Sequence, residues 1–469
     1  MKDKPSVAVL PLARPTFNVA YAEEKLAAML AALDRTGRRI VGPRALLFDA
    51  GATRTAIASL AQEAPAQVLV LQVTFTDAAM MAEIAQAFAG PLAIWAVPEP
   101  RLGGRLRLNA LCGLNLAAHT LGLAGRAFGA LYADPAAAGI GNGLEALLSG
   151  KRDSVPRSLA DAAPPTAAAA AAGRRAVETL AGSRIGRIGR HPDGFSTCAY
   201  DAGRLSELAG VAVEEISLDS FFARAAAVGE RTAVAERAAA EDIADGLDQV
   251  DQPQLDRSLR LRAALGAMRE EGGFDAFAIR CWPEAFTEYG GAVCGPVSMM
   301  GEARVPCACE ADVYGALTTL LLQRIADAPA FLVDLVDLDA ADDTGVVWHC
   351  GQAPASMADP GGRPRATIHT NRRMPLLFEF PLKPGRVTFL RISQARGRTA
   401  AVIGGGEMLA RPMAFTGTSG VVRFDSPAGA VFTTIVDAAL EHHMALAYGD
   451  HRAALEGAAA ALGIPVIRL

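Results

Sequence analysis

The sequence lacks the cysteine patterns that indicate a disulfide framework or a paired-ligand zinc site. Its seven cysteines are an odd number and include no Cys-x-x-Cys pair; they stand at positions 112, 198, 281, 294, 307, 309 and 350. Disulfide-rich domains and structural zinc sites usually show paired cysteines at short spacings. We therefore interpret the cysteines as small buried apolar side chains. The alternative is a zinc or redox site in the group between residues 281 and 350.

An excess of charge of one sign is also absent. Lys and Arg total 45 against 50 Asp and Glu, a formal charge of -5, and neither sign forms a long block. Nucleic acids and anionic membranes require a basic surface, so neither is an expected partner. No apolar stretch near the N-terminus has the length of a signal peptide or a membrane span, which favours a cytoplasmic location. No Gly-x-Gly-x-x-Gly follows the first predicted strand, which argues against a nicotinamide enzyme.

What the chain has is length and ample apolar sequence. Its 469 residues are 51% hydrophobic and 20% charged, a composition typical of globular proteins. Single cores stop growing at roughly 250 to 300 residues, so two or three domains are expected. We predict an N-terminal α/β domain over residues 1–155, a second α/β domain over 156–325 and a β-rich domain over 326–469.

Strand and helix patterns alternate through the first of these regions. Apolar strand patterns occur at 6–10, 67–73 and 92–97, and helical spacing of apolar residues occurs at 21–33 and 77–87. This alternation predicts a parallel sheet with crossover helices.

A stretch rich in Pro and Ala separates the first region from the second. Three prolines fall between residues 156 and 165, and Thr166 then precedes an unbroken alanine run at 167–172. This pattern predicts a boundary followed by a helix that Thr166 caps. The α/β pattern then resumes, with a helix at 255–268 and a strand at 274–279.

The apolar period changes to two beyond about residue 326. Strand patterns occur at 386–392, 399–403 and 420–424, and we interpret Gly404–Gly406 as a turn between strands. The end of the chain departs from this pattern, with helices predicted at 431–440 and 451–462 and a last strand at 464–468.

Ionisable residues in apolar surroundings are the candidates for chemistry, because burying a charge is costly unless it is paired or bound to a metal. Glu310 and Asp312 fall where a strand pattern meets an apolar helix, and a carboxylate there could simply cap that helix. Asp334 closes an apolar strand, where ligands bind in α/β folds. Asp337 and Asp339 follow it, and we interpret them as part of a solvated turn.

Three of the seven histidines, His442, His443 and His451, lie within ten residues. Adjacent histidines usually mean one functional ring and one bystander. Two carboxylates and an imidazole suit a cation such as Mn²⁺ or Mg²⁺. Nothing in the spacing alone brings Glu310, Asp334 and a histidine together.

These segments resemble the L-fucose isomerase and L-arabinose isomerase group, in particular its shorter fucose-isomerase-like members. The resemblance covers most of the chain and is most specific at 309–318, 331–334, 347–351 and 442–450. It implies two Rossmann-like α/β domains followed by a β-rich C-terminal domain, and a homo-oligomer, either a trimer or a hexamer. The chain departs from fucose isomerase in being shorter and in having His442 where that enzyme has an amide residue, which leaves the sugar open.

The resemblance further implies that Glu310, Asp334 and His443 bind Mn²⁺ or Mg²⁺ and that the two carboxylates form the acid/base pair. An aldose and its ketose differ by a proton moved between C1 and C2, which a carboxylate can transfer through an enediol. A divalent ion would polarise the carbonyl and hold both substrate oxygens. The expected function is therefore metal-dependent interconversion of an aldose and a ketose.

Further residues are candidates for contacts with the sugar, although each also has a plain structural interpretation as packing, a turn or a surface loop. They are Arg14, which could reach a neighbouring subunit's site, together with Trp282, His349, Thr418 and His442. Arg184, Arg187 and Arg190 could form an anion subsite, but strand alternation places the first two on opposite faces.

Two other functions remain open at this point. Paired α/β domains also suit a non-catalytic sugar-binding or regulatory protein. A metal-dependent epimerase or lyase that acts on a sugar acid would share the enediolate chemistry.

Overall fold

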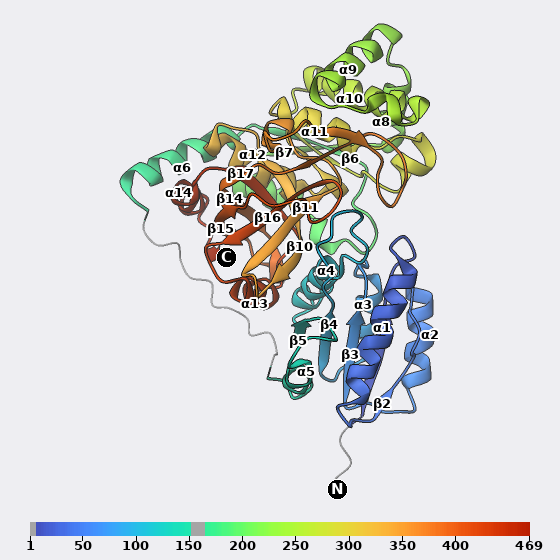
Figure 1. Ribbon diagram of the computed structural model, residues 1–469. Coiled ribbons are helices and arrows are strands. Elements are labelled where there is room, and N and C mark those ends of the chain that lie inside the picture. Colours follow the sequence, from blue (N-terminus) through green and yellow to red (C-terminus); the bar gives the residue numbers. More distant parts are fainter. Residues whose placement is uncertain (1–5, 152–164) are drawn as a thin grey trace.

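The structure is a computed structural model that describes residues 6–151 and 165–469. It is a mixed α/β protein with two parallel sheets and a larger mixed sheet, which confirms the predicted class (Figure 1). The predicted boundary at residues 155 and 156, with Pro156 and Pro164, lies outside the described residues. The domain boundaries and the Rossmann-like character of the first two domains stay predictions. Within the described ranges, no helix is long and apolar enough to cross a membrane.

The first sheet has the order β2-β1-β3-β4-β5, and each of its pairings is parallel, as the sequence predicts. Its strands are β1 (Val7–Leu12), β2 (Ile40–Val41), β3 (Gln67–Gln72), β4 (Leu92–Ala96) and β5 (Phe128–Tyr132). The accompanying helices are α1 (Val19–Asp34), α2 (Ala50–Leu60), α3 (Ala79–Ala87), α4 (Ala110–Leu123) and α5 (Ile140–Leu148). Because β1 is buried along its whole length, it reads in the sequence as a continuous apolar run.

The second sheet, with the order β7-β6-β8-β9, is also parallel. Its strands are β6 (Arg184–Ile188), β7 (Ala212–Ile216), β8 (Ala276–Ile279) and β9 (Cys307–Ala308). The helices of this part are α6 (Ala167–Leu180), α7 (Ala202–Ala209), α8 (Leu218–Ala226), α9 (Glu230–Ile243), α10 (Gln252–Gly272), α11 (Cys294–Glu302) and α12 (Val313–Ala326). The Thr166 hydroxyl accepts a hydrogen bond from the Ala169 amide at 3.2 Å, which confirms the predicted cap of α6.

The third sheet has the order β12-β13-β16-β11-β10-β17-β14-β15-β18, and an additional pairing of β15 with β16 closes part of it into a ring. Its strands are β10 (Phe331–Asp339), β11 (Thr344–His349), β12 (Arg365–Thr367), β13 (Leu377–Pro381), β14 (Gly385–Ser393), β15 (Ala400–Met408), β16 (Thr418–Phe424), β17 (His443–Tyr448) and β18 (Val466–Arg468). Two helices accompany it, α13 (Ala428–Ala438) and α14 (Arg452–Leu462).

The interpretation of Gly404–Gly406 as a turn is wrong, because these glycines lie inside β15. They are needed for close packing. A Cβ on Gly405 would lie 2.5 Å from the Arg386 guanidinium, and a Cβ on Gly406 would lie 2.6 Å from the Arg423 carbonyl oxygen. A glycine run therefore marks a crowded strand here and not a break in the chain.

A close helix contact joins α6 to α14, near the C-terminus. A Cβ on Gly173 of α6 would lie 2.2 Å from the backbone of Gly457, and one on Gly457 would lie 2.2 Å from the Ala169 carbonyl oxygen. Figure 1 shows the two helices side by side. The second part of the chain is thus packed directly on the third.

The strand arrangement brings three distant segments to one place. Strands β10 and β17 are neighbours in the third sheet, and helix α12 packs against β14 and β17. The turn that leads into α12 therefore lies beside the start of β17, and each of these segments carries one of the predicted metal ligands.

Candidate active site

Asp334 and His443 are direct partners across the antiparallel pair β10 and β17. Side chains that face each other in such a pair point to the same side of the sheet. The His443 Nε2 atom lies 3.5 Å from the Asp334 Oδ1 atom. The sequence identifies the two residues as separate candidates, and the strand register places them side by side.

Asp334 does not close its strand, contrary to the prediction, because β10 continues to Asp339 with an irregularity between Leu335 and Asp337. Asp337 is also not in a solvated turn. It is 4% exposed and accepts hydrogen bonds from Arg101 Nε and from the Tyr132 hydroxyl, each at 2.6 Å. Its partners stand more than 200 positions earlier in the chain, so the local sequence could not indicate that its charge is buried and paired.

Glu310 and Asp312 have different tasks in the turn before α12. The Asp312 carboxylate caps the helix, since its Oδ1 atom accepts a hydrogen bond from the Gly315 amide at 2.8 Å. Glu310 caps nothing; it lies in a short turn with φ of 59°, and Ala311 follows with φ of 54°. Left-handed backbone at residues with a Cβ is uncommon and concentrates at functional sites. The capping alternative thus applies to Asp312 alone.

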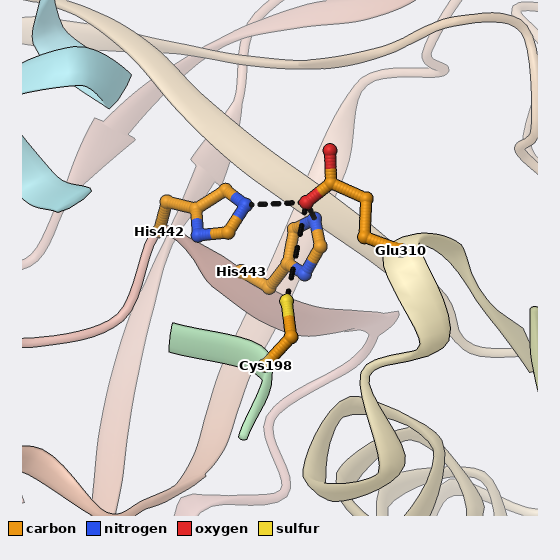
Figure 2. Close-up of side chains that lie close together, drawn as sticks. All are labelled: Cys198, Glu310, His442 and His443. Carbon is orange, nitrogen blue, oxygen red and sulfur yellow. Dashed lines mark hydrogen bonds and ion pairs between the residues drawn. The ribbon is translucent and has the colours of Figure 1, made fainter. Parts of the chain in front are cut away.

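Glu310 lies beside both adjacent histidines (Figure 2). Its Oε2 atom is 3.1 Å from His442 Nε2 and 3.9 Å from His443 Nε2. The Cys198 thiol is 4.0 Å from the same oxygen. On its other side, Glu310 Oε1 accepts a hydrogen bond from the Trp282 indole at 3.1 Å. The carboxylate is therefore held from two directions.

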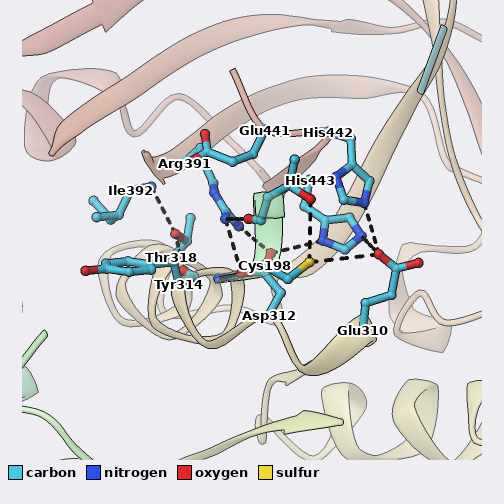
Figure 3. Close-up of polar contacts among 12 residues, drawn as sticks. Cys198, Glu310, Asp312, Tyr314, Thr318, Arg391, Ile392, Glu441, His442 and His443 are labelled. Atoms are coloured by element: carbon cyan, nitrogen blue, oxygen red, sulfur yellow. Dashed lines mark hydrogen bonds and ion pairs between the residues drawn. The ribbon is translucent and has the colours of Figure 1, made fainter. Parts of the chain in front are cut away.

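A buried network behind His443 fixes how its ring is presented (Figure 3). The His443 Nδ1 atom lies 3.0 Å from Asp312 Oδ2, and Arg391 of β14 binds the same carboxylate at 2.6 and 3.1 Å. An ionised Asp312 accepts a hydrogen bond from Nδ1–H, which leaves the lone pair on Nε2 directed at Glu310 and Asp334. Metal-binding histidines commonly have such a carboxylate behind them.

Arg391 is not among the candidates predicted from the sequence, although a signal for it was present. It stands in the apolar strand pattern at 386–392, and a cation in such a strand needs a buried partner. That partner, Asp312, is 79 positions away, and the two side chains are 2% and 1% exposed. The sequence could show that Arg391 is an unusual charge in an apolar strand, but it could not show that Asp312 is its partner.

Burial and neighbouring charges move the pKa values of these groups in opposite directions. Burial raises the pKa of Asp334. Burial acts in the same sense on Glu310, but the hydrogen bond and charge of His442, with the charge of His443, outweigh it and lower the pKa of that carboxyl. Burial would lower the pKa of His443, yet Asp312, Asp334 and Glu310 together raise it.

The donor atoms suit a divalent cation. Asp334 Oδ1 is buried, and among the described residues it has no hydrogen-bond partner. Ligands placed about 2.1 Å from an ion at right angles lie about 3 Å apart. His443 Nε2 lies 3.5 Å from Asp334 Oδ1 and 3.9 Å from Glu310 Oε2, so the side chains would have to draw closer around an ion. Within the described residues the three fall into two compact groups that share His443: Glu310 with Cys198 and His442, and Asp334 with His349. Two carboxylates and one imidazole match the preference of Mn²⁺ or Mg²⁺ for oxygen-rich sites. The residue types therefore fit the expected metal, and His443 is the ligand candidate common to both groups.

His349 lies next to this group but has the wrong tautomer for a ligand. Its Nδ1 atom accepts hydrogen bonds from the Cys350 amide at 2.9 Å and from Gln352 at 3.0 Å. Burial lowers the pKa of His349 to about 3, so the ring is neutral and its proton resides on Nε2. That Nε2 is buried and unpartnered within the described part of the chain. His349 is thus a free hydrogen-bond donor beside the carboxylates.

The group opens into a cavity of about 110 Å³. Of the residues singled out from the sequence, its lining includes Arg14, Trp282, Glu310, Asp334, His349 and His442. Arg14 thus lines the cavity of its own chain. Thr418 does not line it, because its side chain is fully buried in β16 and its hydroxyl is 3.4 Å from the His349 carbonyl oxygen. Thr418 therefore contacts the backbone of a lining residue and not the cavity.

The cysteines are all free thiols, and all but the partly exposed Cys350 are buried, as the apolar interpretation predicts. Cys198 lies close enough to Glu310, His442 and His443 to share a metal ion with them. Its pKa is raised well above the ordinary value by burial and by the Asp312 and Glu310 charges. The thiol is thus neutral where no cation is bound to it.

Two family models match the chain. One describes the N-terminal domain of fucose/sulfoquinovose isomerases and matches residues 8–149, and the other describes the C-terminal domain of L-fucose isomerase and matches residues 377–469. The chain belongs to the fucose-isomerase-like sugar isomerases. The family that the sequence resembles is thereby confirmed, and with it the enzyme class, an aldose–ketose isomerase.

Curated relatives of this sugar isomerase match it over nearly its whole length. A protein of Alkalicoccus urumqiensis named sulfoquinovose isomerase is 28% identical over 99% of both chains. Proteins of the same name from Priestia aryabhattai and Clostridium sp. are 28% and 29% identical, over 95% of this chain and 95% and 94% of theirs.

Proposed function

We propose that this sugar isomerase depends on a divalent cation, Mn²⁺ or Mg²⁺, and acts on sulfoquinovose or a closely related anionic sugar. The observation that carries the metal is the convergence of Glu310, Asp334 and His443 at one end of the cavity, with Asp334 Oδ1 unpartnered within the described residues. The names of the full-length relatives support the sulfonated substrate.

The cation, when bound by these three residues, would polarise the sugar carbonyl and fix its neighbouring oxygen. Glu310 and Asp334 are then the acid/base pair that moves a proton between C1 and C2 through an enediol. Both side chains line the cavity in which the sugar would bind. Each must release its proton again in the second half of the reaction, as a positioned general catalyst does.

Other lining residues support this chemistry. His349 offers a neutral Nε2–H, which can donate a hydrogen bond to a sugar oxygen that becomes negative in the transition state. His442 and Trp282 hold the two oxygens of Glu310 and so set its direction. We therefore propose that His442, a candidate substrate contact by sequence, acts first on Glu310.

The test is turnover of sulfoquinovose in deuterated water by protein stripped with a chelator and then given Mn²⁺ or Mg²⁺. We expect ketose formation only with metal, and deuterium on the carbon beside the new carbonyl. Glu310→Gln should lose at least about a hundredfold in kcat, the scale on which a positioned acid/base group contributes. Glu288→Gln is the matched control, because Glu288 is an exposed side chain in the same part of the chain and does not line the cavity.

Equal turnover by the stripped and the metal-loaded protein would overturn the metal dependence. Deuterium in recovered aldose or in an acid product without ketose would instead indicate an epimerase or lyase. The homo-oligomer, trimer or hexamer, and the cytoplasmic location stay predictions.

A further inference from the structure

Two arginines of the cavity lining contact the Trp282 ring. The Arg14 and Arg372 guanidinium carbons lie 5.3 and 5.6 Å from the centre of the Trp282 ring, within the range of cation–π attraction. The same indole donates its N–H to Glu310 at 3.1 Å. One side chain thus contacts both the proposed acid/base carboxylate, through its N–H, and a pair of cations, over its ring, and all four side chains line the cavity.

The two arginines differ in how their charge is balanced. Arg14 forms an ion pair with Asp77 at 2.5 Å. Arg372 has no ion-pair partner within 4 Å among residues 6–151 and 165–469. Burial and the charge of Arg14 lower the pKa of Arg372, and no carboxylate contributes in the opposite sense. A half-buried guanidinium without a counter-ion is an unfavourable arrangement that a bound anion would relieve.

The loop that carries Arg372 is held in place by a third arginine. Arg105 donates to the Asn371 side-chain oxygen at 2.8 Å and to the Thr16 carbonyl oxygen at 2.6 Å. Asn371 and Thr16 both line the cavity. Arg105 thus joins the loop to the N-terminal part through Nε and Nη2 and does not itself line the cavity, whereas Arg372 does.

The arginines that the sequence suggested for an anion subsite do not fit that role. Arg184 forms an ion pair with Glu214, and Arg187 lies 3.4 Å from Glu215. Arg190 is exposed. None of the three lines the cavity.

We propose that Arg372, assisted by Arg14, binds the anionic end of the sugar and is the residue that selects a sulfonate-bearing substrate over a neutral one. This inference rests on the proposed function. The guanidinium group presents several donors in a plane and matches the oxygens of a tetrahedral anion. Trp282 contacts both Glu310 and the two arginines, so one side chain joins the proposed anion subsite to the proposed acid/base carboxylate.

The experiment compares Arg372→Gln, Arg372→Lys and the control Arg373→Gln, an exposed neighbour. With sulfoquinovose, we expect Arg372→Gln to raise KM by about 10- to 100-fold, the range for loss of a charged hydrogen bond. With glucose, which has a hydroxyl in place of the sulfonate, kcat/KM should change less than about twofold, since the reacting end is untouched. Arg372→Lys should recover part of the loss because it keeps the charge.

A second measurement separates this inference from the proposed function. Calorimetric binding of methanesulfonate needs no turnover, and we expect Arg372→Gln to weaken it while Arg373→Gln does not. If the wild-type enzyme isomerises no sugar, the binding result still decides about Arg372. An Arg372→Gln variant that binds methanesulfonate as tightly as wild type, or that loses activity equally on both sugars, would overturn the inference.

Discussion

Replacement of Asp312 by Asn tests the buried network behind His443. The carboxylate caps α12 through Gly315, pairs with Arg391 and holds His443, and it is 1% exposed. Asn keeps the size and can keep the cap, so the substitution removes mainly the charge. It leaves Arg391 buried without its direct counter-ion.

The size of the effect follows from the partners that remain. Removal of one partner from a buried ion pair typically costs about 3–5 kcal/mol. The Glu441 carboxylate is a second, weaker source of negative charge near Arg391. We therefore expect the lower end, about 3 kcal/mol of the free energy of unfolding. Loss of the acceptor for His443 Nδ1 should in addition weaken metal binding about 10- to 100-fold.

The assays are urea unfolding at pH 7 and calorimetric titration with Mn²⁺. Glu271→Gln is the control, because it breaks a surface pair with Arg224 in which the side chains are 60% and 47% exposed. Exposed pairs contribute about 0–1 kcal/mol. An Asp312→Asn variant that loses no more stability than Glu271→Gln, or that binds Mn²⁺ as tightly as wild type, would contradict these roles of Asp312.

Three shorter predictions concern stability and the cavity wall. Burial, with the charges of Arg372 and Arg105, lowers the pKa of His369 to about 3, so the unfolded chain takes up a proton that the folded chain refuses between pH 6.5 and 3. The free energy of unfolding is therefore unaffected by this ring above pH 6.5 and falls as the pH falls, by up to about 2 kcal/mol from pH 7 to pH 5. Urea unfolding of His369→Gln should lack this pH dependence. Trp282→Phe keeps the ring but removes the N–H that Glu310 accepts, so kcat should fall about tenfold or more in the ketose assay while methanesulfonate binding persists. Gly173→Ala should destabilise by about 1–3 kcal/mol in thermal unfolding, because its Cβ would meet α14 backbone at 2.2 Å, whereas Gly141→Ala, with open space around it, should not.

The sequence is informative wherever a pattern is local. Continuous apolar runs gave the buried parallel strands, and Thr166 before the alanine run gave the start of α6. The glycine run at 404–406 led to a wrong prediction of a turn, because glycine is required for close packing inside a strand as well as in turns. Which of the two applies depends on Arg386 and Arg423, whose position beside β15 no local pattern reveals.

The site is harder to predict from the sequence than the fold, because its geometry is set by strand register. Glu310, Asp334 and His443 were joined through family resemblance, and nothing in their spacing required them to meet. Local reasoning treated Asp337 as solvated, and it overlooked Arg391 altogether. In both cases the missing information was a partner far along the chain: Arg101 and Tyr132 for the first, Asp312 for the second.

The register of β10 against β17 therefore positions two of the three proposed metal ligands. Asp334 faces His443 only in this pairing, and a shift by one residue would turn the carboxylate to the opposite face of the sheet. The buried Arg391 and Asp312 make that shift costly, because Arg391 lies on β14, the other neighbour of β17, and Asp312 reaches His443 itself. The network behind His443 thus has two effects. It directs Nε2 toward the carboxylates, and it fixes the register of β17, which places His443 opposite Asp334.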